Sequence, residues 1–165
     1  FITLNYFGKA YVITLPEATI LLKDSIEEAS LTDKIFILHY LLNAKERLSD
    51  KEQLSFRDLS EGRGYYPTFY KRTISPLLRH FGNDFYHLES LIIKLNGHKS
   101  NIGDLSFDII AFDYVTVTLV LWNGDDDFAS AANYLFKSNI TDYLPIEDIA
   151  NLCQLITAKL ITASS

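Results

Sequence analysis

The alternation of hydrophobic and polar positions is clearest in the second half of the chain. Residues 113–122 (DYVTVTLVLW) alternate weakly and then run apolar, with Val and Thr dominating, which is typical of a strand in a well-buried part of a sheet. Asn123-Gly124 follows, and this pair is the strongest short signal for a two-residue hairpin turn because both residues tolerate positive φ angles. Ala132 to Phe136 then pairs back as a further strand. The pattern predicts the centre of an antiparallel sheet here, since parallel strands need a longer crossover.

Other stretches of strand composition surround this centre. Ile2 to Phe7 and Ala10 to Leu15 predict an opening hairpin with Gly8-Lys9 as its turn. Ala18 to Leu22 is either a short third strand or the start of a loop. Leu105 to Phe112 is a strand that directly precedes residues 113–122.

Apolar residues at helical spacing predict four helices. They are expected at about residues 33–45, 67–82, 84–95 and 145–162. Thr32 or Asp33 is placed to cap the first helix, and Pro67 and Pro145 open the second and fourth because proline at the first helical position loses no hydrogen bond. Pro76 is expected to kink or divide the second helix.

Three polar stretches are expected to be loops. Residues 46–53 are charged and lack periodicity, Ser60 to Gly64 is flexible by composition, and His98 to Gly103 is polar. Because strands and helices are segregated along the chain, the fold class is α+β, with an antiparallel sheet of about five to six strands packed against four helices. Residues 1–165 form one domain, and the native N-terminus is expected to be missing because the chain starts inside a strand and contains no methionine.

The charge and composition of the chain limit the kinds of partner that we expect it to bind. The net charge of −6 and the pI of about 5.1 disfavour a nucleic acid, since an acidic protein repels a phosphate backbone. No apolar run approaches the roughly 18 residues of a membrane span, so no membrane is expected as a partner. The single cysteine, Cys153, excludes an internal disulfide and fits a cytoplasmic protein. Its place in the apolar stripe of the last helix predicts a buried, unreactive thiol.

The most promising chemistry lies between Arg57 and His80, where cationic and aromatic residues alternate. Guanidinium groups bind carboxylates and phosphates in pairs of hydrogen bonds, tyrosine rings offer flat faces, and the predicted helix start at Pro67 adds exposed amide hydrogens. The sequence predicts that these groups converge on a site for a small anionic ligand or a partner protein. The ligand-binding candidates are Arg57, Arg63, Tyr65, Tyr66, Tyr70, Arg72 and His80. The alternative is that the tyrosines belong to the core or to an interface and the charges to a solvated helix face.

The second candidate is a metal site at Asp125, Asp126 and Asp127, whose carboxylates are ligands that calcium and magnesium prefer. Consecutive aspartates point to opposite faces of an extended chain, so a solvated turn is the competing interpretation. No known nucleophile, phosphate-loop or zinc motif is present, and a catalytic role is therefore less expected than a binding role.

Several stretches in order resemble a known family. They are ITLNYFGKAYVITLPE, LHYLLNA, SFRDL with the glycine-rich loop and YYPTFYKR, HFG, GDLSF, LWNGDDDF and ANYLFKSNITDYLPIEDIA. Together they are similar to the prokaryotic family called domain of unknown function 3786, over Ile2 to Leu160. That family has no assigned activity; its members occur in anaerobes, and some relatives carry an additional cysteine-rich iron–sulfur domain, which this chain lacks. The resemblance implies an accessory role near corrinoid, tetrapyrrole or iron–sulfur metabolism and transfers no catalytic residue.

The leading hypothesis is a non-catalytic binding or accessory module that recognises an anionic cofactor or a partner protein through Arg57 to His80. The sequence does not name the cofactor. One alternative is a metal-dependent, hydrolase-like enzyme that uses Asp125 to Asp127 with a histidine. Another is an assembly domain that forms a homodimer or larger homo-oligomer.

Overall fold

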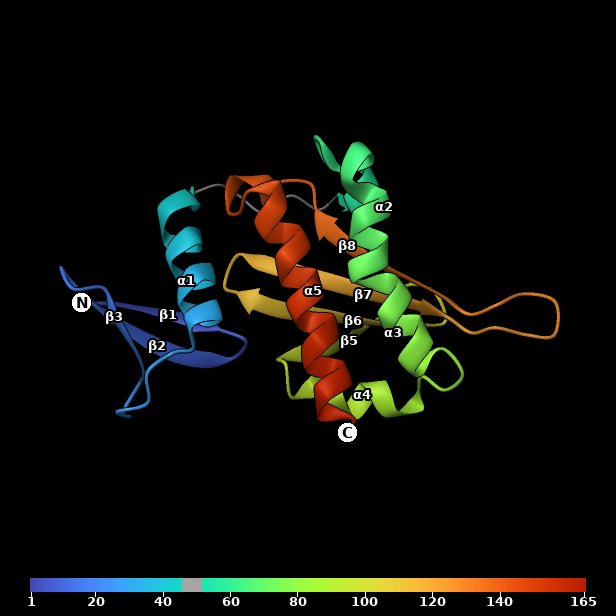
Figure 1. Cartoon of the computed structure of the whole chain (residues 1–165), viewed down its shortest axis with the longest axis horizontal. Coiled ribbons are helices and arrows are strands. Elements are labelled where there is room, and N and C mark those ends of the chain that lie inside the picture. The colour runs from blue at the N-terminus through green and yellow to red at the C-terminus, as the bar shows by residue number, and fades with distance from the viewer. Residues whose placement is uncertain (46–51) are drawn as a thin grey trace.

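A computed structural model of the protein describes residues 1–45 and 52–165, so most of the loop expected at residues 46–53 lies outside the described residues. The α1, α2, α3 and α5 helices lie on one face of an antiparallel sheet (Figure 1). The strands are β1 (Ile2–Tyr6), β2 (Lys9–Thr14), β3 (Thr19–Leu22), β4 (Gln53–Ser55), β5 (Gly97–Ser100), β6 (Leu105–Phe112), β7 (Val115–Trp122) and β8 (Ala131–Lys137). The helices are α1 (Leu31–Asn43), α2 (Gly62–Arg72), α3 (Ile74–Phe81), α4 (Tyr86–Ile93) and α5 (Ile146–Ala163), with short 3-10 turns η1 (Phe56–Asp58) and η2 (Ile140–Asp142).

The α+β class and the antiparallel sheet are confirmed, but the sheet has eight strands where five to six were predicted. Its order is β3-β2-β1-β6-β7-β8-β4, and β5 pairs with β6 beside β1. The two missed strands are β4, which has three residues, and β5, whose sequence is GHKS. Neither is long or apolar enough to show strand periodicity. The β1 strand joins β6 at the single pair Tyr6 and Phe112.

The connection between β7 and β8 is not the predicted two-residue turn. Trp122 pairs with Ala131, so residues 123–130 form an eight-residue loop, which extends from the body of the protein (Figure 1). The Asn123 amide donates to the Asp104 carboxylate at 2.8 Å, and the Asp125 amide donates to the Phe128 carbonyl. The Asn123-Gly124 pair therefore does not form the turn, because Asn123 is bound to Asp104 and the chain turns between Asp125 and Phe128.

The opening hairpin is confirmed with its turn one residue earlier than predicted. Tyr6 pairs with Lys9, so the turn residues are Phe7 and Gly8, with φ angles of 47° and 77°. Positive φ at both central positions matches the turn geometry that suits a twisted hairpin. The short third strand is also present, as β3.

The first helix begins at Leu31, and its cap is Ser30 rather than Thr32 or Asp33. The Ser30 hydroxyl accepts a hydrogen bond from the Asp33 amide at 3.1 Å, which satisfies one of the free amides of the first turn. The last helix, α5, follows Pro145 as predicted.

The second helix begins at Gly62, so the predictions of a flexible loop over residues 60–64 and of a helix start at Pro67 are wrong. A Cβ at Gly62 would lie 1.8 Å from the Phe56 carbonyl oxygen, and only glycine allows the first turn of α2 to pack this tightly on η1. Pro67 lies inside the helix. The expected division occurs at Thr73, three residues before Pro76, and α3 ends at Gly82 as predicted.

The buried side chains form one hydrophobic cluster between the sheet and the helices. Tyr40 of α1 stacks on Phe112 of β6 with ring centroids 4.2 Å apart, and Phe56 stacks on Phe69 of α2 at 4.1 Å. Cys153 is fully buried within this cluster, as predicted. Among the described helices, none combines the length and apolar character needed to cross a lipid bilayer.

Candidate functional site

The predicted arginine and tyrosine site divides between two sides of α2. The Arg57 guanidinium lies 4.2 Å from the centroid of the Tyr66 ring, and the Tyr66 and Tyr70 rings are 6.2 Å apart. A helix turns about 100° per residue, so Arg63 lies on the same side of α2 as Tyr66 and Tyr70. The structure therefore brings Arg57, Arg63, Tyr66 and Tyr70 to one side.

The other two members of this group point elsewhere. Arg72 donates a hydrogen bond to the Tyr65 hydroxyl at 2.9 Å, and the Tyr65 ring lies 6.1 Å from Phe56. By helical periodicity, Arg72 lies about 160° around α2 from Tyr70. Arg57 contacts Tyr66 on one side of α2, and Arg72 contacts Tyr65 on another side. Ligand binding by these residues stays a prediction.

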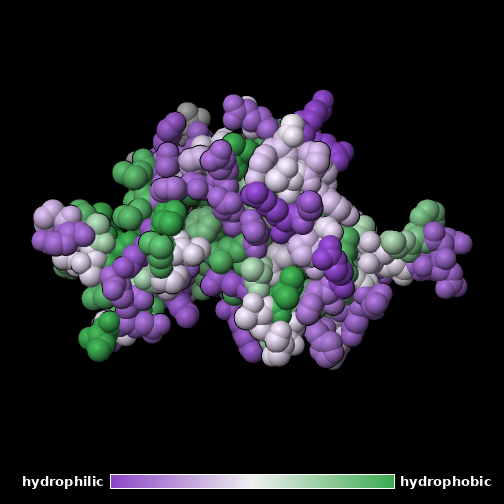
Figure 2. All heavy atoms as spheres, viewed as in Figure 1, coloured by the Kyte–Doolittle hydropathy of each residue, from purple (hydrophilic) through white to green (hydrophobic). Residues whose placement is uncertain are grey.

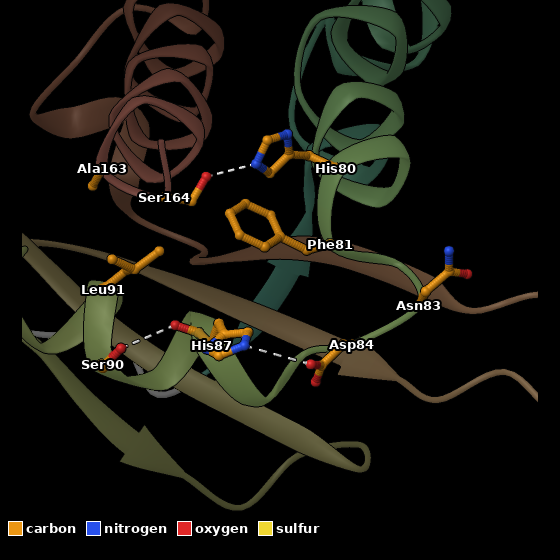
Figure 3. A pocket seen from close by; sticks show the side chains of 9 residues that line it. All are labelled: His80, Phe81, Asn83, Asp84, His87, Ser90, Leu91, Ala163 and Ser164. Carbon is orange, nitrogen blue, oxygen red and sulfur yellow. Dashed lines mark hydrogen bonds and ion pairs between the residues drawn. The ribbon is translucent and has the colours of Figure 1, made fainter.

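His80 lies at the end of α3 and lines a different cavity, of about 480 Å³ (Figure 3). Its Nε2 atom is 2.6 Å from the Ser164 hydroxyl, and His87 of α4 lies 3.8 Å from the Asp84 carboxylate. A serine beside a histidine is the start of a nucleophilic pair. However, the Ser164 hydroxyl also donates to the Ile161 carbonyl at 2.7 Å, and in the described part of the chain no side chain is hydrogen bonded to the second ring nitrogen of His80. The pair lacks the group that would orient it.

The three consecutive aspartates lie in the β7–β8 loop. The Asp125 carboxylate accepts hydrogen bonds from the amides of Asp127 and Phe128 at 2.8 and 2.7 Å, which makes it part of the loop's own turn. Within residues 1–45 and 52–165, no group of three or more His, Cys, Asp or Glu side chains lies close enough together to hold a metal ion. The geometry gives the metal interpretation no support.

A cavity that the sequence did not indicate lies where distant parts of the chain meet. It has a volume of about 320 Å³ and is lined from the opening hairpin, the start of α1, the end of α4 and the last turns of α5. We call it the Tyr6–Asp33 cavity, after the two residues that define its chemistry. Figure 1 shows α1 and the opening hairpin on one side of this junction and α4 and α5 on the other.

Two polar groups of this cavity interact with each other. Tyr6 is only 2% exposed, and its hydroxyl lies within hydrogen-bonding range of the Asp33 carboxylate. One oxygen of that carboxylate, Oδ2, accepts from the Ser30 hydroxyl at 2.8 Å. Burial, followed by the charge of Asp33 and the hydrogen bond to its carboxylate, raises the pKa of Tyr6 far above its usual range. The Tyr6 phenol therefore stays protonated and donates to Asp33.

Cationic groups surround the same cavity. Its lining includes Lys9 of β2, Lys94 after α4, and Lys159 of α5. None of the three ammonium groups forms an ion pair with another described residue, and Lys159 lies 5.6 Å from the centroid of the Phe7 ring. The lining also includes three acidic residues, Glu27, Glu28 and Asp33, of which Glu28 forms an ion pair with Lys34 and Asp33 interacts with Tyr6. Ammonium groups that pair with no described residue suit a negatively charged ligand.

The comparison with protein families covers nearly the whole chain. The model of the family described as domain of unknown function (DUF3786) matches residues 2–159. The chain belongs to the DUF3786 family. A search of curated proteins and a search of solved structures each returned no match.

In this DUF3786 protein, the cavity residues gave no signal in the sequence. Tyr6 is one of several aromatic and aliphatic residues in a strand, and Asp33 resembles an ordinary residue of a helix's first turn. The lysines are separated by 85 and 65 positions, at residues 9, 94 and 159. Only the pairing of β1 with β6 and the packing of α4 and α5 bring these groups together.

Proposed function

We propose that this DUF3786 protein is a binding module for a small anionic ligand, which occupies the Tyr6–Asp33 cavity. The observation that carries the proposal is the set of three lysines, Lys9, Lys94 and Lys159, which line the cavity and form no ion pair with a described residue. Hydrogen bonds between an ammonium group and an anion are stronger than those between neutral groups. A bound anion would supply a partner for these lysines.

The size of the cavity restricts the ligand. A volume of about 320 Å³ is at the small end of the range for ligand sites, about 300–1,000 Å³. It suits a small organic acid or phosphate ester better than a tetrapyrrole or corrinoid ring. An accessory role near corrinoid or iron–sulfur metabolism would then involve a small acid of that metabolism and not the macrocycle.

The test is a titration of the full chain with a panel of small carboxylates and phosphate esters, by thermal shift and calorimetry. Replacing Lys159 with glutamine removes one cation from the cavity and should weaken binding about tenfold, as expected for one charge-assisted contact. Lys99→Gln is the matched control, since Lys99 lies on β5 near Glu89, outside the cavity. The proposal fails if no acid of the panel binds, or if Lys159→Gln binds as tightly as Lys99→Gln.

A second candidate function is self-association, as in the assembly hypothesis. Leu31, Ile35 and Leu42 of α1 are 75%, 45% and 81% exposed, and their spacing puts them on one stripe of the helix. Figure 2 shows hydrophobic side chains gathered over α1 and the N-terminal strands. We propose that this stripe packs against the same stripe of a second copy, since exposed apolar patches mark interaction sites.

Native mass from light scattering tests this second candidate. The wild type should give a dimer at micromolar concentrations, and Leu42→Lys should give a monomer of the same thermal stability. Ile93→Lys, on α4 and also exposed, is the control and should remain dimeric. A monomeric wild type, or a dimeric Leu42→Lys variant, contradicts the self-association.

A further inference from the structure

We infer that the ligand of the Tyr6–Asp33 cavity carries an ammonium group as well as its acidic groups, as an acidic amino acid or a phosphorylated amine does. The inference rests on the proposed function and deepens it by naming the chemical class of the ligand. It follows from the charged residues of the lining, which are of both signs.

The charges of the cavity come from two sides. Glu27 lies between β3 and α1, and Asp33 lies in the first turn of α1. Lys94 follows α4, and Lys159 lies near the end of α5. Figure 1 shows α1 and the opening hairpin on one side of this junction and α4 and α5 on the other. The two carboxylates therefore line one wall of the cavity, and two of the three lysines line a different wall.

Glu27 is the acidic residue of the lining whose carboxylate is left for a ligand. Glu28 is paired with Lys34, and the carboxylate of Asp33 is already bonded within the cavity. The Glu27 amide donates to the Ser25 hydroxyl, whereas the Glu27 carboxylate forms no ion pair or hydrogen bond with a described residue.

The carboxylate of Glu27 acts on an aromatic ring of the cavity. Tyr11 is buried and lines the cavity together with Glu27. Burial, followed by the charges of Asp33 and Glu27, raises the pKa of Tyr11. The negative charge of Glu27 is therefore felt inside the cavity, beside a phenol ring. A carboxylate and the face of an aromatic ring both attract an ammonium group.

A ligand with charges of one sign leaves part of this lining unmatched. A simple dianion suits the lysines, but the carboxylates of Glu27 and Asp33 repel it. A simple amine suits Glu27, but the three lysines repel it. A ligand with both kinds of group places its ammonium beside Glu27 and its acidic groups beside the lysines.

The balance of charge sets the number of acidic groups. Three ammonium groups face two carboxylates that have no cationic partner among the described residues, so the lining has an excess of positive charge. A ligand with one ammonium group and two negative charges complements this excess. Acidic amino acids have these charges, and so do phosphorylated amines, because a phosphate monoester carries about two negative charges at neutral pH. Both classes include molecules small enough for a cavity of about 320 Å³.

The experiment compares acids that differ by one ammonium group, by calorimetry on the full chain. Aspartate is succinate with an added ammonium, glutamate is glutarate with an added ammonium, and phosphoethanolamine is ethyl phosphate with an added ammonium. We expect at least one of the ammonium compounds to bind about tenfold or more tightly than its partner, as one charge-assisted contact provides. The pair that shows the preference identifies the carboxylate or the phosphate class.

Three variants assign the preference to the cavity. Glu27→Gln removes the partner of the ammonium group and should reduce the preference at least threefold, while the wild-type fold persists in circular dichroism. Glu17→Gln is the matched control, since Glu17 lies in the turn between β2 and β3, outside the lining, and should keep the preference. Lys159→Gln should weaken both members of a pair alike, because it removes a partner of the acidic group that they share.

The outcomes separate this inference from the proposed function. Equal binding of the two members of every pair, or tighter binding of the members without the ammonium, overturns the inference but leaves the anionic-ligand proposal standing. A preference that Glu27→Gln keeps in full, or that Lys159→Gln reduces as much as Glu27→Gln does, also overturns it. If none of the six compounds binds, both are overturned.

Discussion

Replacing Tyr6 with phenylalanine should destabilise the protein, because it removes the hydroxyl that interacts with the buried Asp33 carboxylate. The ring is held by aromatic neighbours, with centroids 4.8 Å from Phe7, 5.0 Å from Phe112 and 6.1 Å from Tyr11, and phenylalanine keeps these contacts. The variant loses only the hydroxyl, whose partner is the Asp33 carboxylate. Because a hydrogen bond to a charged group contributes about 1.5–3 kcal/mol, its loss should lower the free energy of unfolding by that amount.

Tyr134 provides the matched control. It is also fully buried, but its hydroxyl lies 2.8 Å from the Thr157 hydroxyl, which in turn donates to the Thr73 carbonyl. Removing this hydroxyl in Tyr134→Phe breaks a satisfied hydrogen bond, which should lower the free energy of unfolding by about 1 kcal/mol. The same chemical change is thus predicted to cost more at Tyr6, whose partner is charged, than at Tyr134, whose partner is neutral.

Urea unfolding followed by the fluorescence of Trp122, the only tryptophan, measures both changes. For a chain of this length, 1 kcal/mol corresponds to a shift of about 2–4 °C in Tm, so a thermal scan by circular dichroism gives an independent reading. If Tyr6→Phe destabilises the protein no more than Tyr134→Phe does, the Tyr6 hydroxyl does not bond to the Asp33 carboxylate in solution. The description of this pair would then be refuted.

Three further predictions concern packing, pH and reactivity. Gly62→Ala should destabilise the protein by about 1–3 kcal/mol, because the new methyl group overpacks against Phe56. Gly64→Ala has open space around the new methyl group and should stabilise the protein by about 0.5–1 kcal/mol. If the urea midpoints of the two variants move in the same direction, this reasoning is rejected. Burial, with Asp113 nearby, raises the pKa of Tyr40 to about 12, whereas the Tyr40 phenol of the unfolded chain loses its proton near pH 10. The Tm should therefore fall as the pH rises from 10 to 12. The fall should be shallower in Tyr40→Phe. Burial raises the pKa of the Cys153 thiol, so a thiol reagent should label it only after unfolding, and rapid labelling of the native protein would contradict its burial.

The elements that could be predicted from the sequence are those with long, regular patterns. The β6 strand and α5 carry eight and eighteen residues of clear periodicity. In both segments the tertiary contacts stabilise the same secondary structure that the local sequence favours. The β5 strand has no such pattern, since its residues are polar and it forms only because β6 offers a free edge next to β1. Short edge strands of this kind depend on their neighbours and not on their own composition.

The start of α2 could not be predicted because it depends on a single tertiary contact. Two glycines within three residues favour a loop, but the tight approach of Gly62 to Phe56 makes the first glycine a requirement of the helix. Misplacing this start by five residues also hid the separation of the candidate site. Once α2 begins at Gly62, helical periodicity alone puts Tyr65 and Arg72 on a different side from Tyr66 and Tyr70.

The Tyr6–Asp33 cavity was missed for a different reason. Its chemistry is not carried by any local spacing, since its residues come from β1, β2, α1, α5 and the segment after α4. What marks it is a buried phenol and a carboxylate beside three lysines, and this group of side chains is brought together only by the tertiary fold.

The central claim is that this cavity, and not the surface of α2, receives the ligand. The most direct measurement is a titration of the protein, with its ten tyrosine rings labelled with ¹³C, against the acid that binds most tightly, followed by NMR. We predict that the ring signals of Tyr6 and Tyr11 move with the added acid, while those of Tyr65, Tyr66 and Tyr134 stay in place. Movement of Tyr65 or Tyr66 with Tyr6 unchanged would contradict the claim and return the site to the arginines of α2.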